Sequence, residues 1–232
     1  MSAIGPLSEP APGCKPAAIA ALTADQQTKY DQFLAEVQSW ETLPTTKAGT
    51  ETAPLSDNER LWLTRECLLR YLRATKWNLP QAITRIKATL VWRREFGAES
   101  ITADYISPEN ETGKQVQLGF DNEARPCLYL LPQNQNTKAG QRQVEHLVYM
   151  LERSTDLHPP GQDTFALLID FRNTTSSSNP PMSQSKQVLD ILQSHYPERM
   201  GRCLLTHRMC ILYASIMICS HLIQYPGTSP PS

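Results

Sequence analysis

Residues 195–202, with the sequence HYPERMGR, place the strongest constraint on what this chain can fold into. An amphipathic segment precedes them and a short apolar run, residues 203–205, follows them. Pro197 excludes helix at its own position and favours an extended backbone just before it. The stretch therefore predicts a corner between a helix and a strand, with Glu198 and Arg199 at the rim of a sheet.

The side chains of Glu198 and Arg199 suit a polar ligand. A guanidinium group can form two parallel hydrogen bonds with a phosphate, and a carboxylate can accept hydrogen bonds from hydroxyl groups or hold a cation. A surface turn with a local ion pair is the alternative interpretation of the same two residues. Taken alone, the two residues leave both interpretations open.

Capping signals mark three helices in the first half of the chain. The predicted helices are residues 22–40 with Thr23 as N-cap, a second helix starting at Ser56, and a third from Asn78 to Gly97. We expect Leu61 and Leu68 on the buried face of the second helix. Residues 1–20 are predicted to be disordered and residues 44–54 to form a linker.

Arg70 and Arg73 lie one helical turn apart on the second predicted helix, so they present positive charge on one side of it. A solvated helix face is the simplest interpretation of this pair. Contact with the phosphate of a lipid is the other interpretation.

The second half of the chain alternates between strand and helix patterns. The predicted elements are strands at 116–120 and 127–131 joined by a turn, a helix at 141–157, a strand at 165–171, a helix at 185–195 and a strand at 202–206. The unbroken apolar run at 165–171 indicates a strand covered on both faces. Alternating strands and helices predict an α/β fold with parallel crossovers.

Apolar and aromatic residues of the predicted strands have two interpretations. Tyr129, with Leu128, Leu130, Leu167 and Ile169, could line a cavity for acyl chains. The same residues could instead fill a packed core, which is the simpler expectation.

Composition limits the classes of function. The chain has 232 residues, 40% of them hydrophobic, and a formal net charge of −1. That is enough to bury one sizeable core, and the absence of a basic excess argues against nucleic-acid binding. Six cysteines without any C-x-x-C pair are typical of reduced thiols in a cytoplasmic protein.

The sequence carries no motif of a common enzyme class. It has no nucleophile elbow, Walker loop or dinucleotide fingerprint, and its five histidines lack metal-ligand spacing. Asp170, at the end of an apolar strand, is expected to cap a nearby loop. We therefore expect no catalytic residue, no metal and no cofactor, and an α/β hydrolase remains a remote alternative.

Five segments, in their order and spacing, resemble one known family. They are RYLRATKW at 70–77, WRREFG at 92–97, DNEARP at 121–126, LLIDF at 167–171 and YPERMG at 196–201. Together they are similar to the CRAL-TRIO lipid-binding domain family, in the branch of fungal phosphatidylinositol-transfer proteins and nearest its pleiotropic and azole drug resistance subgroup. The resemblance covers roughly residues 55–206. It implies an N-terminal helical unit at 21–97, then a partial lipid-binding domain at 98–206 with a mainly parallel sheet and flanking helices.

The resemblance also implies roles for particular residues. Glu198 and Arg199 match a family pair that recognises the headgroup of a phosphoinositide, and Tyr129, Arg70 and Arg73 are candidates for further contacts with the lipid. A basic residue common in the family is replaced here by Thr75.

The likeness stops after Thr206. The remaining headgroup partners and the gating helix of the family are absent, and an apolar tail at 207–232 stands in their place. The tail indicates a truncated or misspliced reading frame whose product is impaired in transfer, or, as the alternative, a C-terminal membrane anchor.

The expected function is non-enzymatic binding and transfer of phospholipid, with phosphatidylinositol as the expected ligand and a second lipid left open. We expect a cytoplasmic monomer that associates peripherally and transiently with intracellular membranes and binds no nucleic acid. The alternative function is a membrane-tethered or protein-interaction module without transfer activity.

Overall fold

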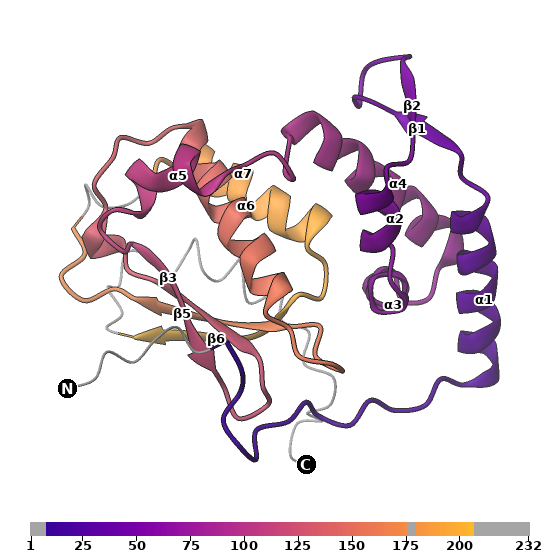
Figure 1. The fold of residues 1–232 in the computed structure, drawn as a ribbon, viewed down its shortest axis with the longest axis horizontal. Helices are drawn as coiled ribbons and strands as arrows, with labels where there is room; N and C mark the ends of the chain where they lie inside the picture. The colour runs from indigo at the N-terminus through magenta and orange to yellow at the C-terminus, as the bar shows by residue number, and fades with distance from the viewer. Residues whose placement is uncertain (1–7, 176–179, 207–232) are drawn as a thin grey trace, which may run out of the picture.

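A computed structural model describes residues 8–175 and 180–206 of the chain, which fold around two separate hydrophobic cores (Figure 1). The helical unit contains α1 (Ala24–Gln38), β1 (Thr42–Pro44), β2 (Thr52–Pro54), α2 (Asp57–Trp62), α3 (Arg65–Ala74) and α4 (Leu79–Phe96). The α/β part contains α5 (Ala103–Asn110), β3 (Gln115–Phe120), β4 (Pro126–Leu130), the 3-10 helix η1 (Pro132–Asn134), α6 (Gln141–Asp156), β5 (Phe165–Asp170), α7 (Met182–His195) and β6 (Met200–Thr206). The predicted α/β fold with an N-terminal helical unit is confirmed.

The N-terminal caps of the helical unit are those that the sequence indicates. Thr23 and Ser56 each form a complete capping box with the residue three positions on. Asn78 caps α4, and Gly97 ends it with a left-handed φ of 72°. Residues 8–20, which precede this unit, contain no helix or strand, and their predicted disorder stays a prediction.

The second predicted helix is two helices. α2 ends at Trp62, and Thr64 caps a new helix, α3, by accepting a hydrogen bond from the backbone N–H of Cys67. Because the backbone turns at Leu63, the apolar spacing does not continue from one helix to the next. Leu68 is fully buried, but the expectation that Leu61 is buried is wrong, since 75% of it is exposed.

The predicted linker at 44–54 is also wrong, because its two ends pair. Leu43 lies opposite Ala53 in the antiparallel hairpin of β1 and β2. Arg94 of α4 holds this hairpin in place: its guanidinium donates to the carbonyl oxygens of Leu43 (2.7 Å) and Pro54 (2.9 Å) and pairs with Glu59. The hairpin is thus held by an arginine at least 40 residues away, and the local sequence has no alternation of apolar residues that would predict its strands.

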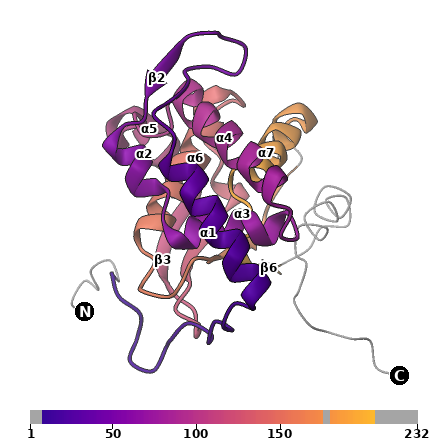
Figure 2. The same cartoon turned by 90° about the vertical axis from the view of Figure 1, so that its right-hand side faces the viewer.

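The main sheet has the strand order β3-β4-β5-β6, with β3 antiparallel to β4 and the other neighbours parallel. Helices α5, α6 and α7 lie over one face of this sheet (Figure 1). α4 extends from the helical unit to pack beside α7, and Figure 2 shows the two helices adjacent when the molecule is viewed from the helical unit. The C-terminal end of α7 therefore faces the helical unit.

Strand β3 does not alternate as predicted. The pairing with β4 shifts between Gln117 and Phe120, and Gly119 within this bulge has a φ of +68°. The bulge changes the direction of the intervening side chains, so that 50% of Leu118 is exposed.

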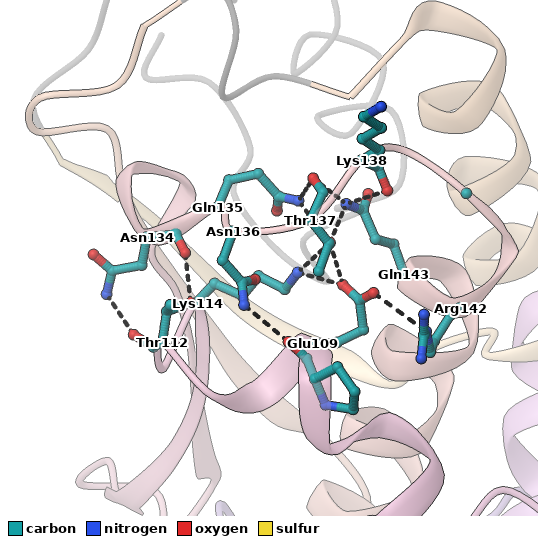
Figure 3. Close-up of polar contacts among 12 residues, drawn as sticks. Glu109, Thr112, Lys114, Asn134, Gln135, Asn136, Thr137, Lys138, Arg142 and Gln143 are labelled. Atoms are coloured by element: carbon teal, nitrogen blue, oxygen red, sulfur yellow. Dashed lines mark hydrogen bonds and ion pairs between the residues drawn. The ribbon is translucent and has the colours of Figure 1, made fainter.

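The segment between β4 and α6 is held by a buried ionic network (Figure 3). The ammonium group of Lys114 pairs with Glu109, and Thr137 donates to the same carboxylate at 2.6 Å. Gln143 of α6 donates to Thr137 Oγ1 at 2.9 Å. Because Lys114 and Glu109 are both buried, their charges must compensate one another, and the network fixes residues 132–138 on the scaffold.

Candidate functional site

An apolar cavity of about 400 Å³ lies between the sheet and helices α6 and α7. Its lining residues are Leu128 and Leu130 of β4, Leu147 and Leu151 of α6, Phe165, Leu167 and Ile169 of β5, Val188, Leu192, Tyr196 and Pro197 of α7 and the corner after it, and Met200 of β6. For these side chains the structure shows a lined cavity rather than a completely filled core. The cavity also corrects the expectation for residues 165–171: Phe165, Ala166 and Phe171 are buried, whereas Leu167 and Ile169 are half-buried.

Tyr129 does not line this cavity. Side chains alternate along a strand, so Tyr129 lies on the face opposite to Leu128 and Leu130. Its partners in register are Val116 on β3 and Leu168 on β5. Tyr129 is therefore not among the lining residues of this cavity, and its contact with a lipid elsewhere stays a prediction.

One end of the cavity is charged. Lys76, Arg85 and Glu198 line the cavity together with Gln193. Lys76 and Glu198 both have left-handed backbones, with φ values of 52° and 56°. Neither Lys76 nor Arg85 was predicted as a site residue from the sequence, although Lys76 lies in the RYLRATKW segment that resembles the family. Two cations and one carboxylate at the mouth of an apolar cavity suit a ligand with a phosphate, hydroxyl groups and hydrocarbon.

Glu198 and Arg199, the predicted pair, lie side by side in the sequence at the bend between α7 and β6, but their side chains have different surroundings. Glu198 is exposed and lines the cavity, whereas Arg199 is half-buried and donates to the carbonyl oxygen of Asp163 at 3.0 Å. Within residues 8–175 and 180–206, no ion pair joins Glu198 to Arg199. The alternative of a local ion pair at this turn is therefore wrong.

Arg70 is not part of a solvated helix face. It is only 1% exposed, and its Nη1 donates to the carbonyl oxygen of Pro197 at 3.2 Å. Arg73, one turn on, forms an ion pair of 2.8 Å with Asp163 and stays partly exposed. α3 packs against the corner and against the segment before β5, which is why the arginine side of this helix faces inward.

Arg70, Arg73 and Arg199 form a cationic cluster behind the corner, with Asp163 as the carboxylate beside it. Burial, and then the charge of Arg70, lowers the pKa of Arg199 to about 10. Burial and the charge of Arg199 likewise lower the pKa of His158 to about 4, so this imidazole is neutral at pH 7. An excess of buried positive charge favours the approach of an anion.

One further expectation concerns Asp170. Its Oδ1 accepts the backbone N–H of Arg172 at 2.9 Å, as a carboxylate that caps the following loop should. This contact agrees with the structural role expected from the sequence.

Comparison with known proteins agrees with this combination of fold and cavity. The model of the CRAL/TRIO domain matches residues 110–225, and the model of the CRAL/TRIO N-terminal domain matches residues 29–88. The chain belongs to the CRAL/TRIO family. The N-terminal match lies in the helical unit, and the domain match includes all four strands of the main sheet.

Two curated relatives narrow the branch. A CRAL-TRIO domain-containing protein of Schizosaccharomyces pombe is 51% identical over 79% of this chain and 18% of its own length. The phosphatidylinositol transfer protein PDR17 of Saccharomyces cerevisiae is 41% identical over 90% of this chain and 64% of its own length. The chain therefore belongs with the fungal CRAL/TRIO proteins, and it spans less than two thirds of the length of either relative.

Among solved structures, the crystal structure of Sfh5 shares the fold, with a TM-score of 0.58 over 89% of this chain and 78% of that chain. At 12% identity, this likeness concerns the fold alone. Of the helices at residues 8–175 and 180–206, none has the length and apolar character to cross a bilayer. Within the same residues, no group of three or more potential ligands could hold a metal ion. The tail at 207–232 lies outside the described residues.

Proposed function

We propose that the chain binds a phospholipid and takes part in its transfer between membranes, with phosphatidylinositol as the ligand; impaired transfer by this form stays a prediction. The observation that carries this proposal is a cavity whose lining is mainly apolar but also includes the charged residues Lys76, Arg85 and Glu198. An amphiphile with one charged head satisfies both parts of such a cavity, because buried hydrocarbon leaves water while the head keeps polar partners.

The chemistry of the mouth supports an inositol headgroup. A carboxylate can only accept hydrogen bonds when ionised, so Glu198 suits a ligand with several hydroxyl groups. Lys76 and Arg85 supply the positive charge that a phosphodiester needs. A choline headgroup could place its positive ammonium group near Glu198, but unlike inositol it has no hydroxyl group to donate a hydrogen bond to this carboxylate.

The cationic cluster of Arg70, Arg73 and Arg199 supports the same ligand class from behind the corner. Arg70 Nε is buried and has no hydrogen-bond partner among the described residues, so the cluster retains capacity for an anion. Within this proposal Arg199 and Arg73 attract the phosphate electrostatically, and Glu198 contacts the hydroxyl groups.

The proposed protein is non-enzymatic: it binds and releases its ligand without breaking a bond. We place it in the cytoplasm as a monomer that meets membrane surfaces transiently. The alternative function, a membrane-tethered or protein-interaction module without transfer activity, stays a proposal. Because Arg70 is buried, only Arg73 of that pair is accessible to a docking partner. A second lipid remains open, since the apolar cavity does not distinguish acyl chains by their headgroups.

The direct experiment is lipid capture. Purified protein is incubated with vesicles of phosphatidylinositol and phosphatidylcholine in equal amounts, repurified, and its bound lipid identified by mass spectrometry. We expect enrichment of phosphatidylinositol, and about a tenfold loss of this enrichment in Glu198→Gln, as the removal of a charged hydrogen-bond partner implies.

The matched control is Glu111→Gln, an exposed carboxylate at the end of α5 that does not line the cavity. It should leave capture unchanged. Recovery of no phospholipid above the level of an unrelated protein would exclude the proposal for this chain.

A further inference from the structure

The five residues before Glu198, Gln193 to Pro197, are held one after another by helices α3, α4 and α6. This segment, which we name the corner, is the last turn of α7 and the bend into β6. The carbonyl groups in the last turn of a helix have no partner within the helix and need donors from elsewhere. At this corner the donors come mainly from the helical unit.

The first contact replaces a hydrogen bond that proline removes. In a continuing helix the carbonyl oxygen of Gln193 would accept from the N–H of residue 197, but Pro197 has none. Arg85 of α4 supplies the missing donor: its Nη2 lies 2.7 Å from Gln193 O. Its positive charge at the C-terminal end of α7 also complements the helix dipole.

The next two carbonyl groups face a pair of hydroxyl groups. Tyr71 of α3 and Thr89 of α4 lie 2.8 Å apart through their hydroxyl oxygens. Thr89 Oγ1 lies 3.1 Å from His195 Nδ1, 3.1 Å from Arg85 O of its own helix and 3.4 Å from Ser194 O, and Tyr71 Oη lies 3.4 Å from His195 O. Each hydroxyl group has one proton, so the pair shares these acceptors and does not donate to all of them at once. The imidazole ring of His195 also stacks on Trp92, with 4.1 Å between the ring centres.

The last two residues of the corner are held from two sides. Tyr196 donates its hydroxyl proton to Glu152 of α6 at 2.6 Å, and Arg93 of α4 fixes this carboxylate with two hydrogen bonds. The carbonyl oxygen of Pro197 accepts from the buried Arg70 at 3.2 Å. The backbone therefore arrives at residue 198 in a determined direction.

Glu198 itself is different. Its φ of +56° lies in the left-handed region, which costs free energy for a residue with a Cβ atom. Nothing in the described part of the chain holds its carboxylate by a hydrogen bond or ion pair. A strained conformation of this kind persists only where the surrounding structure over-determines it.

We propose that Tyr71 and Thr89 are positioning residues: they lock the corner so that Glu198 keeps its left-handed backbone and presents its carboxylate to the headgroup of the ligand. This inference rests on the proposed function of Glu198 and assigns to the helical unit a role in headgroup selection. The apolar lining of the cavity holds the acyl chains of any phospholipid, whereas the locked corner distinguishes one lipid headgroup from another.

The test removes hydroxyl groups without changing shape, in the variants Thr89→Val and Tyr71→Phe. Hydrogen exchange followed by mass spectrometry then reports on residues 193–199, independently of any lipid. We expect about tenfold faster exchange in this segment and unchanged exchange in α6, because the loss of hydrogen bonds opens the corner locally. Thr89→Ser keeps the hydroxyl group and should restore protection.

The functional readout is the ratio of phosphatidylinositol to phosphatidylcholine captured, measured well below the unfolding temperature. We expect Thr89→Val to lower this ratio several-fold while the total amount of bound lipid stays similar. The matched control is Thr155→Val, since the hydroxyl group of Thr155 bonds only to Leu151 O of its own helix. A merely structural role for Thr89 would lower capture of both lipids equally.

The two proposals fail in different ways. If Thr89→Val exchanges like the wild type at residues 193–199, the inference is overturned whatever the lipid result. If exchange rises but the ratio stays constant while Glu198→Gln changes it, the corner does not select the headgroup and the proposed function stands. If neither variant changes the ratio, Glu198 is not a headgroup ligand, and the inference falls with that assignment.

Discussion

The guanidinium group of Arg125 passes over β6 at Gly201, where a side chain of any size would displace it. A Cβ atom on Gly201 would lie 2.5 Å from Arg125 Nε and 2.5 Å from Thr164 Oγ1. These are the two atoms that form a hydrogen bond of 3.1 Å across the strand. The glycine of the YPERMG segment and the arginine of the DNEARP turn are therefore parts of one contact.

Gly201→Ala should consequently destabilise the fold. The added methyl group must push Arg125 and Thr164 apart, and overpacking of this kind costs about 1–3 kcal/mol. Urea denaturation measures the difference. Gly140→Ala is the control for added volume, because its Cβ atom would find no neighbour closer than 3.9 Å; as Gly140 is the N-cap residue of α6, any loss of stability there measures the cap alone. Equal urea midpoints for Gly201→Ala and the wild type would show that Arg125 and Thr164 accommodate the added methyl group without loss of stability.

Substitutions at Glu198 should separate stability from binding. Glu198→Gly removes the left-handed strain and should raise the free energy of unfolding by about 0.5–1 kcal/mol, while it abolishes the enrichment of phosphatidylinositol. Glu198→Ala should lose the enrichment without the gain in stability, because alanine keeps its Cβ atom. Thermal unfolding and lipid capture measure the two effects. A Glu198→Gly variant no more stable than Glu198→Ala would contradict the assignment of strain.

Breaking the buried pair of Glu109 and Lys114 should lower the free energy of unfolding far more than breaking a surface pair. Glu109→Leu leaves a buried ammonium group without its carboxylate and should cost about 3–5 kcal/mol. The double variant Glu109→Leu with Lys114→Met should recover most of this loss, since no charge remains to be buried. Asp25→Asn, which breaks an exposed pair with Lys29, should cost under about 1 kcal/mol. Chemical denaturation of the four proteins tests the comparison, and a double variant as unstable as Glu109→Leu would contradict it.

Acid should destabilise the protein below about pH 6.5, in part through His146. This residue is fully buried, and burial together with the charge of Lys114 lowers its pKa to about 4. In the unfolded chain the pKa of a histidine is about 6.5. Between these two values the unfolded state binds a proton that the folded state does not, so stability falls as the pH falls, by up to about 1.4 kcal/mol per pH unit.

His146→Leu should remove this contribution. Both ring nitrogens of His146 are buried without hydrogen-bond partners in the described part of the chain, so an apolar replacement loses no hydrogen bond. We expect equal or greater stability at pH 7 and a shallower fall of the unfolding temperature between pH 6.5 and pH 4.5. The pKa values of His158 and His195 are also lowered, so these two residues should account for the fall of the unfolding temperature that remains. An unchanged slope in His146→Leu would exclude this residue as a source of acid sensitivity.

The sequence alone determined the elements whose signals are local. Thr23, Ser56 and Asn78 start their helices because an N-cap needs only residues within the first turn. The corner after α7 follows from Pro197, which cannot continue a helix. The α/β class followed from the alternation of strand and helix patterns, and the family from five short segments.

Only the tertiary structure decided the features that depend on distant residues. Arg70 is buried because the carbonyl oxygen of Pro197, 127 residues away, replaces its water. The hairpin of β1 and β2 is tied to α4 by Arg94, which donates hydrogen bonds to its carbonyl groups. Glu198 faces the cavity and Arg199 faces Asp163 because the left-handed backbone between them turns neighbouring side chains apart, and three helices fix that turn. Periodicity reports which side of an element is apolar, but burial, strain and cavities arise from what packs against that side.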